Sequence, residues 1–534
     1  MQEYDDGVIQ EDAFELGTQA ASTASAVLFG RVFTVIVAGI AFILVARLLG
    51  PSSYGVYTVA MAVVGFFTGI ASLSMGTTFG KFIAEYSSKH ENAKIAELLL
   101  NGYLIFFVMG LFLVLVALSL SGILASHVLH NSTDAYVLEL SAFIIFVSVL
   151  FNDSVAALTG FVGLGRSISI SVALQVTVQS VVSIALAFMG YGAIAPLIGL
   201  LLSYIAGAAY SLQAIFRRVP MSGAKVSLKA IKGILRFAVP LEVSNIIVSI
   251  ANNITVLVLG LFVATSVIGN IGIVQRTSSL VGAVSDSLGI AILPMFAADM
   301  ARRSHDPERS VKFFNYAVYV AFLFITPIML YTILLAKPFT VTVFNGTYSG
   351  ASLYIAIMSI GVLLGILGTY AVSLLTSANK VKLVAMCYAV IAVVQLAFLA
   401  VLVPTFKGIG AVVQMFIIVP LVTAAVFVYA ARRSINAHVD YGRILRILLS
   451  GIISAAFILP LIYVMGSDYI VLLAAAFVEQ LLLYPPVLAL TRAATRKDFN
   501  ILKTVSGRVP LVSTIMGLLV DYSALFCPVS QEGT

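Results

Sequence analysis

Long, nearly uncharged apolar stretches constrain this chain more than any motif does. A helix needs about 20 mostly apolar residues to cross roughly 30 Å of hydrocarbon. Only 10% of the residues are charged, against about 25% in soluble domains. The sequence therefore predicts an all-α polytopic membrane protein. Fourteen stretches are long enough to span, at 25–48, 54–76, 97–120, 136–156, 169–189, 193–216, 237–260, 268–293, 313–336, 351–376, 382–404, 409–431, 445–466 and 469–490.

The chain also matches itself at a fixed offset of 214 residues, which is typical of duplicated membrane bundles. Matching pairs include Asn101 with Asn315, Gly55 with Gly269, Asn131 with Asn345, Arg166 with Lys380 and, after a slip of one residue, Arg217 with Arg432. Each copy holds six predicted spans, an even number, so both copies enter the membrane in the same direction. We expect two six-helix lobes in a parallel repeat, related by a pseudo-two-fold axis along the membrane normal.

Charge distribution predicts the orientation of the spans. Of the 30 Lys and Arg residues, only Arg47, Lys337 and Lys407 lie in loops on one side of the predicted membrane, and Arg31 and Arg276 lie within spans. The others cluster on the opposite side, as cytoplasmic loops do. We expect a multi-pass protein of the cytoplasmic (plasma) membrane with both termini in the cytoplasm. This pattern explains the net charge of +7 without a nucleic-acid partner.

The spans and loops define the expected domain organisation. An acidic N-terminal segment without Lys or Arg, expected to be disordered or to lie on the membrane surface, precedes the first lobe. A basic linker joins the lobes, and two further spans and a cytoplasmic tail follow the second. These parts cover 1–24 (N-terminal segment), 25–216 (N-lobe), 217–236 (linker), 237–433 (C-lobe), 434–490 (last two spans) and 491–534 (tail).

Several short motifs resemble one known family. Residues 31–86 read RVFTVIVAGIAFILVARLLGPSSYGVYTVAMAVVGFFTGIASLSMGTTFGKFIAEY, and GLGR stands at 163–166 and FNGTYSGAS at 344–352. With the fourteen-span layout, these motifs resemble the polysaccharide-biosynthesis family of flippases, within the multidrug, oligosaccharidyl-lipid and polysaccharide exporter superfamily. The resemblance covers nearly the whole chain. It implies two lobes around a central cavity that work by alternating access.

Charged residues inside predicted spans are the main candidates for function. Such residues cost about 2.5–3.5 kcal/mol at a helix centre and usually face a cavity. Five of them stand out: Arg31, Asp153, Glu242, Arg276 and Asp286. No charge stands at the positions 214 residues away from them, so the duplication does not extend to these charges. We infer that the unmatched charges serve the substrate or the coupling. Simple explanations stay open for those near the inner boundary: Arg31 can reach the headgroups, and Asp153 and Glu242 can be solvated there.

Polar residues recur at helical spacing around two of these charges. Glu242, Asn245, Ser249 and Asn252 share one face of the span at 237–260, and Arg276, Ser279 and Asp286 share one face of the next span. Another span places Gln175 and Gln179 on one face. A solvated cavity between the lobes would account for all of these positions together.

The leading functional hypothesis is a flippase for a lipid-linked oligosaccharide, that is, a glycan on polyprenyl phosphate or pyrophosphate. Arginine can hold such a phosphate by charge-assisted hydrogen bonds, which makes Arg31 and Arg276 phosphate candidates. Polar side chains would bind sugar hydroxyls, and three acidic side chains would couple transport to ions or protons. The sugar-binding candidates are Asn245, Asn252, Ser279, Gln175 and Gln179, and the coupling candidates are Asp286, Glu242 and Asp153.

The expected partners are the lipid-linked glycan, membrane lipid, a coupling cation or proton, and glycosyltransferases or a polymerase of the same pathway. No cofactor or metal is expected. A cation-coupled multidrug exporter of the same fold and a peptidoglycan-precursor lipid flippase stay open as alternatives. A membrane glycosyltransferase or polymerase is disfavoured, because the short loops hold no visible catalytic constellation. We therefore expect a transporter without enzymatic activity.

Overall fold

The computed structural model describes the backbone of most of the chain as long helices. Described residues are 2–300, 307–378, 380–466, 468–494, 522 and 526, and side chains are described within these ranges except at 2–33, 240, 241, 243–245, 283–300 and 307–310. No strand occurs in this described part. By their internal contacts the helices divide into unit 1, Met1–Ile273 with Leu399–Ala411, and unit 2, Val274–Phe398 with Val412–Thr534.

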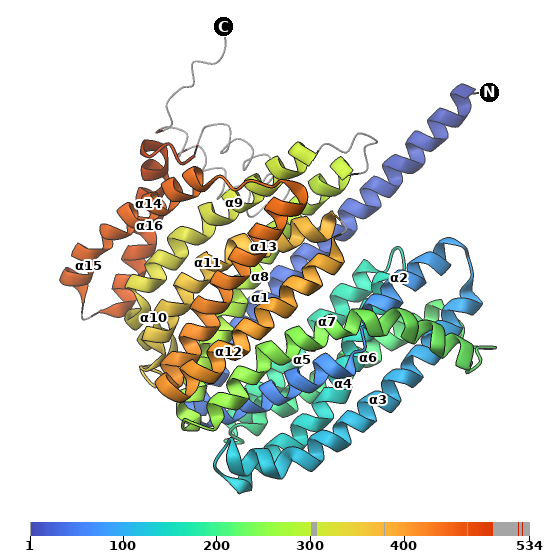
Figure 1. Ribbon diagram of the computed structural model, residues 1–534, viewed down its shortest axis with the longest axis horizontal. Coiled ribbons are helices and arrows are strands. Elements are labelled where there is room, and N and C mark those ends of the chain that lie inside the picture. Colours follow the sequence, from blue (N-terminus) through green and yellow to red (C-terminus); the bar gives the residue numbers. More distant parts are fainter. Residues whose placement is uncertain are drawn as a thin grey trace. The chain divides into compact units, whose positions relative to one another are not determined.

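Unit 1 is built from the first seven helices and the start of the eighth (Figure 1). Within it α5 packs along both α1 and α6, α4 packs along α6 and α3, and α7 packs along α1. Its helices are α1 (Gln2–Ala71), α2 (Met75–Ser88), α3 (Asn92–His127), η1 (Ser132–Asp134), α4 (Ala135–Thr159), α5 (Gly165–Phe188), α6 (Ile194–Arg218), α7 (Leu228–Gly260) and α8 (Thr265–Met300).

Unit 2 contains the rest of α8 and the later helices, apart from a short part of α12. Here α11 packs against α9 and α13, and α14 packs against α9 and α16 (Figure 1). Its helices are α9 (Pro307–Leu334), α10 (Ala336–Phe344), α11 (Ala351–Ser377), α12 (Val381–Val413), η2 (Gln414–Ile418), α13 (Val419–Ile435), α14 (Tyr441–Ala456), α15 (Ile458–Met465) and α16 (Tyr469–Leu490).

The predicted all-helical membrane fold is confirmed. Ten helical stretches in the described part of the chain are long and apolar enough to cross a membrane. Two of them, Thr34–Ala71 and Val381–Ile435, each contain two predicted spans. Gly50 (φ 71°) and Lys407 (φ 51°) interrupt those two helices, at the boundaries where the sequence separates the spans. Every predicted span lies mainly on a helix, and the total of fourteen crossings stays a prediction.

The structure also differs from the sequence expectation at several boundaries. The acidic segment 1–24 is helical from Gln2. A break at residues 72–74 interrupts the predicted span 54–76, and α2 then continues to Ser88. Phe457 separates α14 from α15 inside the span predicted at 445–466. The short apolar stretch at 510–520, within the predicted tail, lies outside the described residues.

Two asparagines matched by the 214-residue offset make equivalent contacts in the two units. In unit 1 the Asn101 amide donates to Lys225 O (3.1 Å) and accepts from Ser227 N–H (2.9 Å). In unit 2 the Asn315 amide donates to His438 O (2.7 Å) and accepts from Asp440 N–H (3.1 Å). Each asparagine therefore holds in place the segment that leads into a later helix, α7 in unit 1 and α14 in unit 2. The contacts support a shared ancestry of the two halves.

The helices that follow these two segments begin with the same kind of cap. Ser227 accepts a hydrogen bond from the Ala230 amide at the start of α7, and Asp440 accepts one from the Arg443 amide at the start of α14. Serine and aspartate are favoured at this position because their side chains satisfy amides that have no helical partner. The start of α7 in unit 1 thus corresponds to the start of α14 in unit 2.

Candidate functional site

Two buried carboxylates from different helices meet at the break between α1 and α2 in unit 1. At this break Leu73 (φ 43°) and Ser74 (φ 51°) adopt the left-handed conformation, which ordinary residues rarely use. Ser74 stands at the N-cap of α2, and its hydroxyl makes no hydrogen bond to the helix amides. That hydroxyl instead donates to a side chain from another helix.

Glu242 of α7 is hydrogen-bonded to two residues of the break. Its side chain accepts hydrogen bonds from the Ser72 hydroxyl (3.1 Å) and the Ser74 hydroxyl (2.7 Å). The residue is only 2% exposed. Hydrogen bonds to an ionised group are roughly twice as strong as neutral ones, so the two serines compensate part of the cost of burying this carboxylate.

Asp153 of α4 lies on the other side of the break and is 4% exposed. The backbone amide of Gly76, in the first turn of α2, donates to its carboxylate, and the charge of Glu242 acts on it. A helix N-terminus favours negative charge, which explains why one oxygen lies there. The other oxygen, Oδ2, is buried without a hydrogen-bond partner among the described residues.

The arrangement brings together two acidic groups that the sequence places 89 positions apart. Two negative charges in one apolar site repel each other strongly, because the surrounding dielectric is low. A proton or a small cation at the unpartnered oxygen of Asp153 would relieve that repulsion. Among the described residues no group of three His, Cys, Asp or Glu side chains could hold a metal ion.

Close packing of α7 against α1 sets the position of Glu242. The Ser249 hydroxyl donates to the carbonyl oxygen of Gly65 (2.9 Å). A side chain at Gly65 would collide with Asn253, and one at Gly69 would collide with Ser249. Small residues allow such close approach between helices in lipid, where packing and hydrogen bonds replace the hydrophobic driving force. The face of α7 that carries Glu242 and Ser249 is therefore fixed against α1.

The glutamines predicted to bind sugar lie in the α5–α6 contact. Gln175 is 8% exposed and donates to Gln179 (3.0 Å) and to the Ser203 hydroxyl (3.1 Å). On the same pair of helices, the Ser211 hydroxyl donates to Ser171 (2.9 Å). These bonds stabilise the packing of two helices. A role of Gln175 and Gln179 in binding sugar stays a prediction.

The remaining candidates are dispersed. Asn252 on α7 and Arg276 and Ser279 on α8 are exposed, and the Ser279 hydroxyl donates to the carbonyl oxygen of Gln275 (2.9 Å). Arg276 has no carboxylate partner among the described side chains. Arg31, Asn245 and Asp286 lie outside the described side chains.

The structure adds acidic and hydroxyl groups that the sequence argument missed. Glu479, in the span at 469–490, accepts a hydrogen bond from the Tyr331 hydroxyl (2.7 Å), and its second oxygen is buried without a partner among the described residues. Its charge within a predicted span was an available signal. Ser72 and Ser74 carried only a weak signal, because serine is common in membrane helices and nothing else marks the break.

Comparison with known proteins places the chain in a family. The model of a family described as "Polysaccharide biosynthesis protein" matches residues 44–353. A comparison with curated proteins found no match.

Solved structures of transporters share the fold. The chain is similar to the lipid II flippase MurJ in an inward closed conformation, with a TM-score of 0.70 and 14% identity over 88% of this chain and 98% of that one. It is also similar to an inward-facing multidrug resistance MATE family transporter of the MOP superfamily, with a TM-score of 0.60 and 16% identity over 77% of this chain and 98% of that one. A MOP superfamily transporter from Pyrococcus furiosus gives a TM-score of 0.52 at 16% identity, over 78% and 95%.

These likenesses are too distant in sequence to transfer a substrate, but they agree on architecture. The match of the family model covers more than half of the chain, and the apolar helices described above suit a multi-pass membrane protein. The chain belongs to the polysaccharide biosynthesis protein family and has the fold of the MOP-superfamily flippases and transporters.

Proposed function

We propose that this protein is a flippase that moves a lipid-linked oligosaccharide across the plasma membrane by alternating access, driven by a proton or cation that binds at Asp153 and Glu242. The observation that carries the proposal is a buried oxygen of Asp153 that has no hydrogen-bond partner among the described residues and lies beside a second carboxylate. A buried ionisable group in a membrane helix is expensive and commonly marks an ion or proton pathway.

The break at residues 72–74 links this acidic pair to a conformational change. The two serines that bind Glu242 and the amide that binds Asp153 all belong to the break or to the first turn of α2. When a proton or cation neutralises a carboxylate, its hydrogen bonds to these groups weaken. The α1–α2 junction is thus the element whose geometry would respond to coupling.

The cargo is proposed from the family and from Arg276. A family of polysaccharide biosynthesis proteins needs glycans to cross the membrane on a carrier lipid, whose phosphate is anionic. Arg276 is exposed on α8 within a predicted span, where a charge usually faces a polar cavity. A guanidinium there can bind a phosphate by bidentate hydrogen bonds.

The experiment is transport by full-length protein reconstituted in vesicles. The probe is an undecaprenyl-pyrophosphate oligosaccharide with a fluorescent sugar, and flipping is measured as protection from an external glycosidase under an imposed pH or sodium gradient. We expect gradient-dependent flipping by the wild type. Arg276→Ala should lower it by at least tenfold, because about 1.4 kcal/mol, less than one charged hydrogen bond, already corresponds to a factor of ten.

Arg166→Ala is the matched control, because Arg166 is exposed at the start of α5 and outside the proposed sites. It should flip the probe at the wild-type rate. Normal flipping by Arg276→Ala would remove Arg276 from cargo binding. A wild type that flips no glycolipid but exports a cationic dye under the same gradient would instead make the protein a multidrug exporter.

A further inference from the structure

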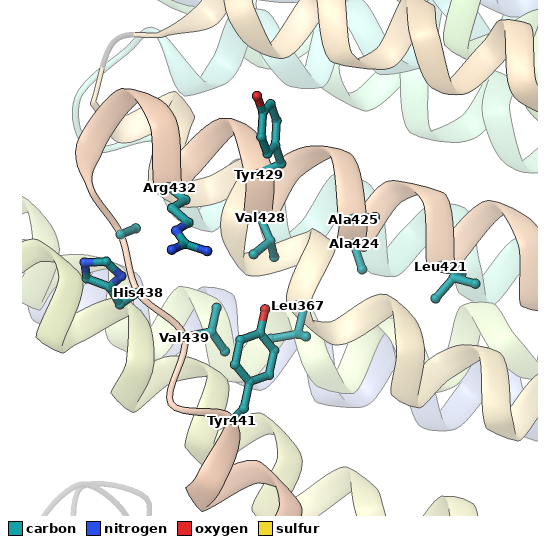
Figure 2. A pocket seen from close by; sticks show the side chains of 11 residues that line it. Leu367, Leu421, Ala424, Ala425, Val428, Tyr429, Arg432, His438, Val439 and Tyr441 are labelled. Carbon is teal, nitrogen blue, oxygen red and sulfur yellow. The ribbon is translucent and has the colours of Figure 1, made fainter.

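A cavity on unit 2 is lined by none of the residues of the candidate site. It has a volume of about 480 Å³, within the range of about 300–1,000 Å³ that small-molecule sites occupy. Figure 2 shows it between α13, α11 and the segment that leads into α14. Its walls are polar at one end and apolar at the other.

The polar end lies where α13 finishes. Arg432 extends from the last turn of α13 toward His438, and the Tyr441 hydroxyl points into the same space (Figure 2). Arg432 has no carboxylate within ion-pair distance among the described residues. The side chain of the nearby Asp440 instead caps α14 by accepting from the Arg443 amide (3.0 Å). This end therefore offers a guanidinium that forms no ion pair with the described residues.

The apolar end continues along α13 toward the middle of the helix. Val428, Ala424 and Leu421 line it from α13, and Leu367 lines it from α11 (Figure 2). Leu421 is 49% exposed, so this end is open at the side. The positively charged end and the open apolar end of the cavity together complement a lipid that has an anionic headgroup.

Tyrosines at the cavity indicate its depth in the membrane. Tyr429 and Tyr441 both line it and are about 60% exposed (62% and 60%). Exposed tyrosines gather at the level of lipid headgroups, where the ring is in apolar surroundings and the hydroxyl is in water. The polar end of the cavity is therefore at headgroup level, and the apolar end is at the level of acyl chains.

The segment of unit 1 that Asn101 binds is equivalent to the segment of unit 2 that borders this cavity. The segment at 219–227, after α6, is longer than the segment at 436–440, after α13. It packs Met221 and Ala224 against the apolar core of unit 1, and Val219 is 1% exposed. In unit 2 the shorter segment borders the cavity through Ala437, His438 and Val439.

We propose that this cavity binds an anionic phospholipid of the surrounding membrane, with its phosphate at Arg432 and His438 and an acyl chain along Ala424 and Leu421. A guanidinium binds phosphate by two parallel hydrogen bonds, and the imidazole adds another donor. The site would keep a lipid attached to the α11–α13 contact. It does not depend on the proposed transport activity, because a resident lipid would bind whatever the cargo is.

The test uses full-length protein in a neutral detergent, titrated with dioctanoyl phosphatidylglycerol and followed by native mass spectrometry. Dioctanoyl phosphatidylcholine has the same chains without net charge, and glycerol 3-phosphate has the phosphate without chains. We expect phosphatidylglycerol to bind at least fivefold tighter than phosphatidylcholine and glycerol 3-phosphate to bind far more weakly than either lipid. Arg432→Ala should weaken phosphatidylglycerol about tenfold, as expected for one charged hydrogen bond.

Two further variants separate the two ends of the cavity. Ala424→Phe fills the apolar end and should weaken both lipids. Arg217→Ala removes the repeat-matched arginine of unit 1, which is exposed at the end of α6, and should change nothing. Apparent melting temperatures identify any variant that is misfolded, and Arg432→Lys then serves as a milder replacement that should give an intermediate affinity.

Three results would overturn the proposal. Equal binding of the two phospholipids would show that the charge at Arg432 is not used. Unchanged affinity in folded Arg432→Ala and Ala424→Phe would place the lipid elsewhere. Tight binding of glycerol 3-phosphate, matching that of phosphatidylglycerol, would make this a site for free phosphate compounds and not for lipid.

Discussion

Units 1 and 2 share their anchoring contacts and differ in what lies between corresponding helices. Asn101 and Asn315 fasten equivalent segments with the same pair of hydrogen bonds. Yet Asp153, buried on α4 beside a second carboxylate, corresponds by the 214-residue offset to Leu367, which lines an apolar cavity wall on α11. The two units thus share these hydrogen-bonded anchors and differ in the chemistry of their helix faces.

This difference teaches that equivalence of position does not imply equivalence of role. In unit 1 the faces are filled by serines, glutamines and the acidic pair, which bond one helix to another. Both units have a buried apolar cluster, with Phe79 in unit 1 and Phe314 and Phe427 in unit 2, so the contrast lies in the polar bonds of unit 1 and the cavity of unit 2. Three changes test how far the contrast extends.

The largest effect is expected from Asp153→Asn in unit 1. The amide keeps the volume of the carboxylate and removes its charge, so it can no longer bind and release a proton or cation. Gradient-driven flipping in vesicles should fall by about 100-fold or more, while flipping without a gradient should change much less. Glu139→Gln, on the exposed face of the same helix, should leave both rates unchanged.

An equal loss of both rates in Asp153→Asn would contradict a coupling role and would indicate a structural one. Unaltered gradient dependence would exclude Asp153 from coupling altogether. Either result would mean that the chemical difference between Asp153 and Leu367 does not give the two units different roles in coupling.

An intermediate effect is expected from the two asparagines, and it should differ between the units. Asn101 is fully buried and its two bonds are partly buried, so Asn101→Ala leaves a partly buried carbonyl and amide without partners, at a cost of about 1–3 kcal/mol. Asn315 is more exposed, and water can replace its bonds, so Asn315→Ala should cost about 0.5–1.5 kcal/mol. Apparent melting temperatures in detergent measure both.

The two asparagines share no hydrogen-bond partner, so the double variant should show the sum of the single effects to within about 0.5 kcal/mol. A larger loss from Asn315→Ala than from Asn101→Ala would show that burial does not set the cost of losing these bonds. A strongly non-additive double variant would show that the two fastenings depend on each other.

The smallest effect is expected from an exposed acid in the same unit as the buried pair. Glu85 and Lys89 form an ion pair on α2 (2.7 Å), and the hydrogen bond to Lys89 lowers the pKa of Glu85 from 4.5 while the bond to Glu85 raises the pKa of Lys89 from 10.5. The stabilisation is present between those two values. It is lost as pH falls through the lowered pKa of Glu85 or rises through the raised pKa of Lys89.

Because both groups are exposed and screened by salt, Glu85→Gln at pH 7 should shift the apparent melting temperature by about 1 °C or less. Raising the salt concentration should remove even that difference. A shift of several degrees would mean that α2 depends on its surface charges and not on the acidic pair at its first turn.

Sequence alone predicted the helical membrane fold, because apolar stretches of spanning length leave few alternatives. It also singled out Asp153 and Glu242 as buried charges. It did not bring them together, because the contact depends on the break at residues 72–74, where neither glycine nor proline marks the change of direction. The offset identified Asn101 and Asn315 as equivalent without showing what they bind.

Helical spacing predicted where helices form better than it predicted which residues of a helix face a neighbouring helix. Ser249 faces α1 as the polar stripe on α7 implies, but Asn253 lies against Gly65 while Asn252 is exposed. This one-residue difference arises because two helices approach closely at glycines. The spacing of polar residues in the sequence does not reveal such an approach. The charge of Glu479 was readable in the sequence, but its bond to Tyr331 depends on packing between α16 and α9.

The asparagine fastenings have a mechanical consequence. A carbonyl and an amide two residues further on, both held by one side chain, fix the direction of a peptide segment as well as its position. The start of α7 is therefore expected to move together with α3, and the start of α14 together with α9. We therefore expect bending at joints elsewhere in the helices, such as Gly50, residues 72–74, Lys407 and Phe457.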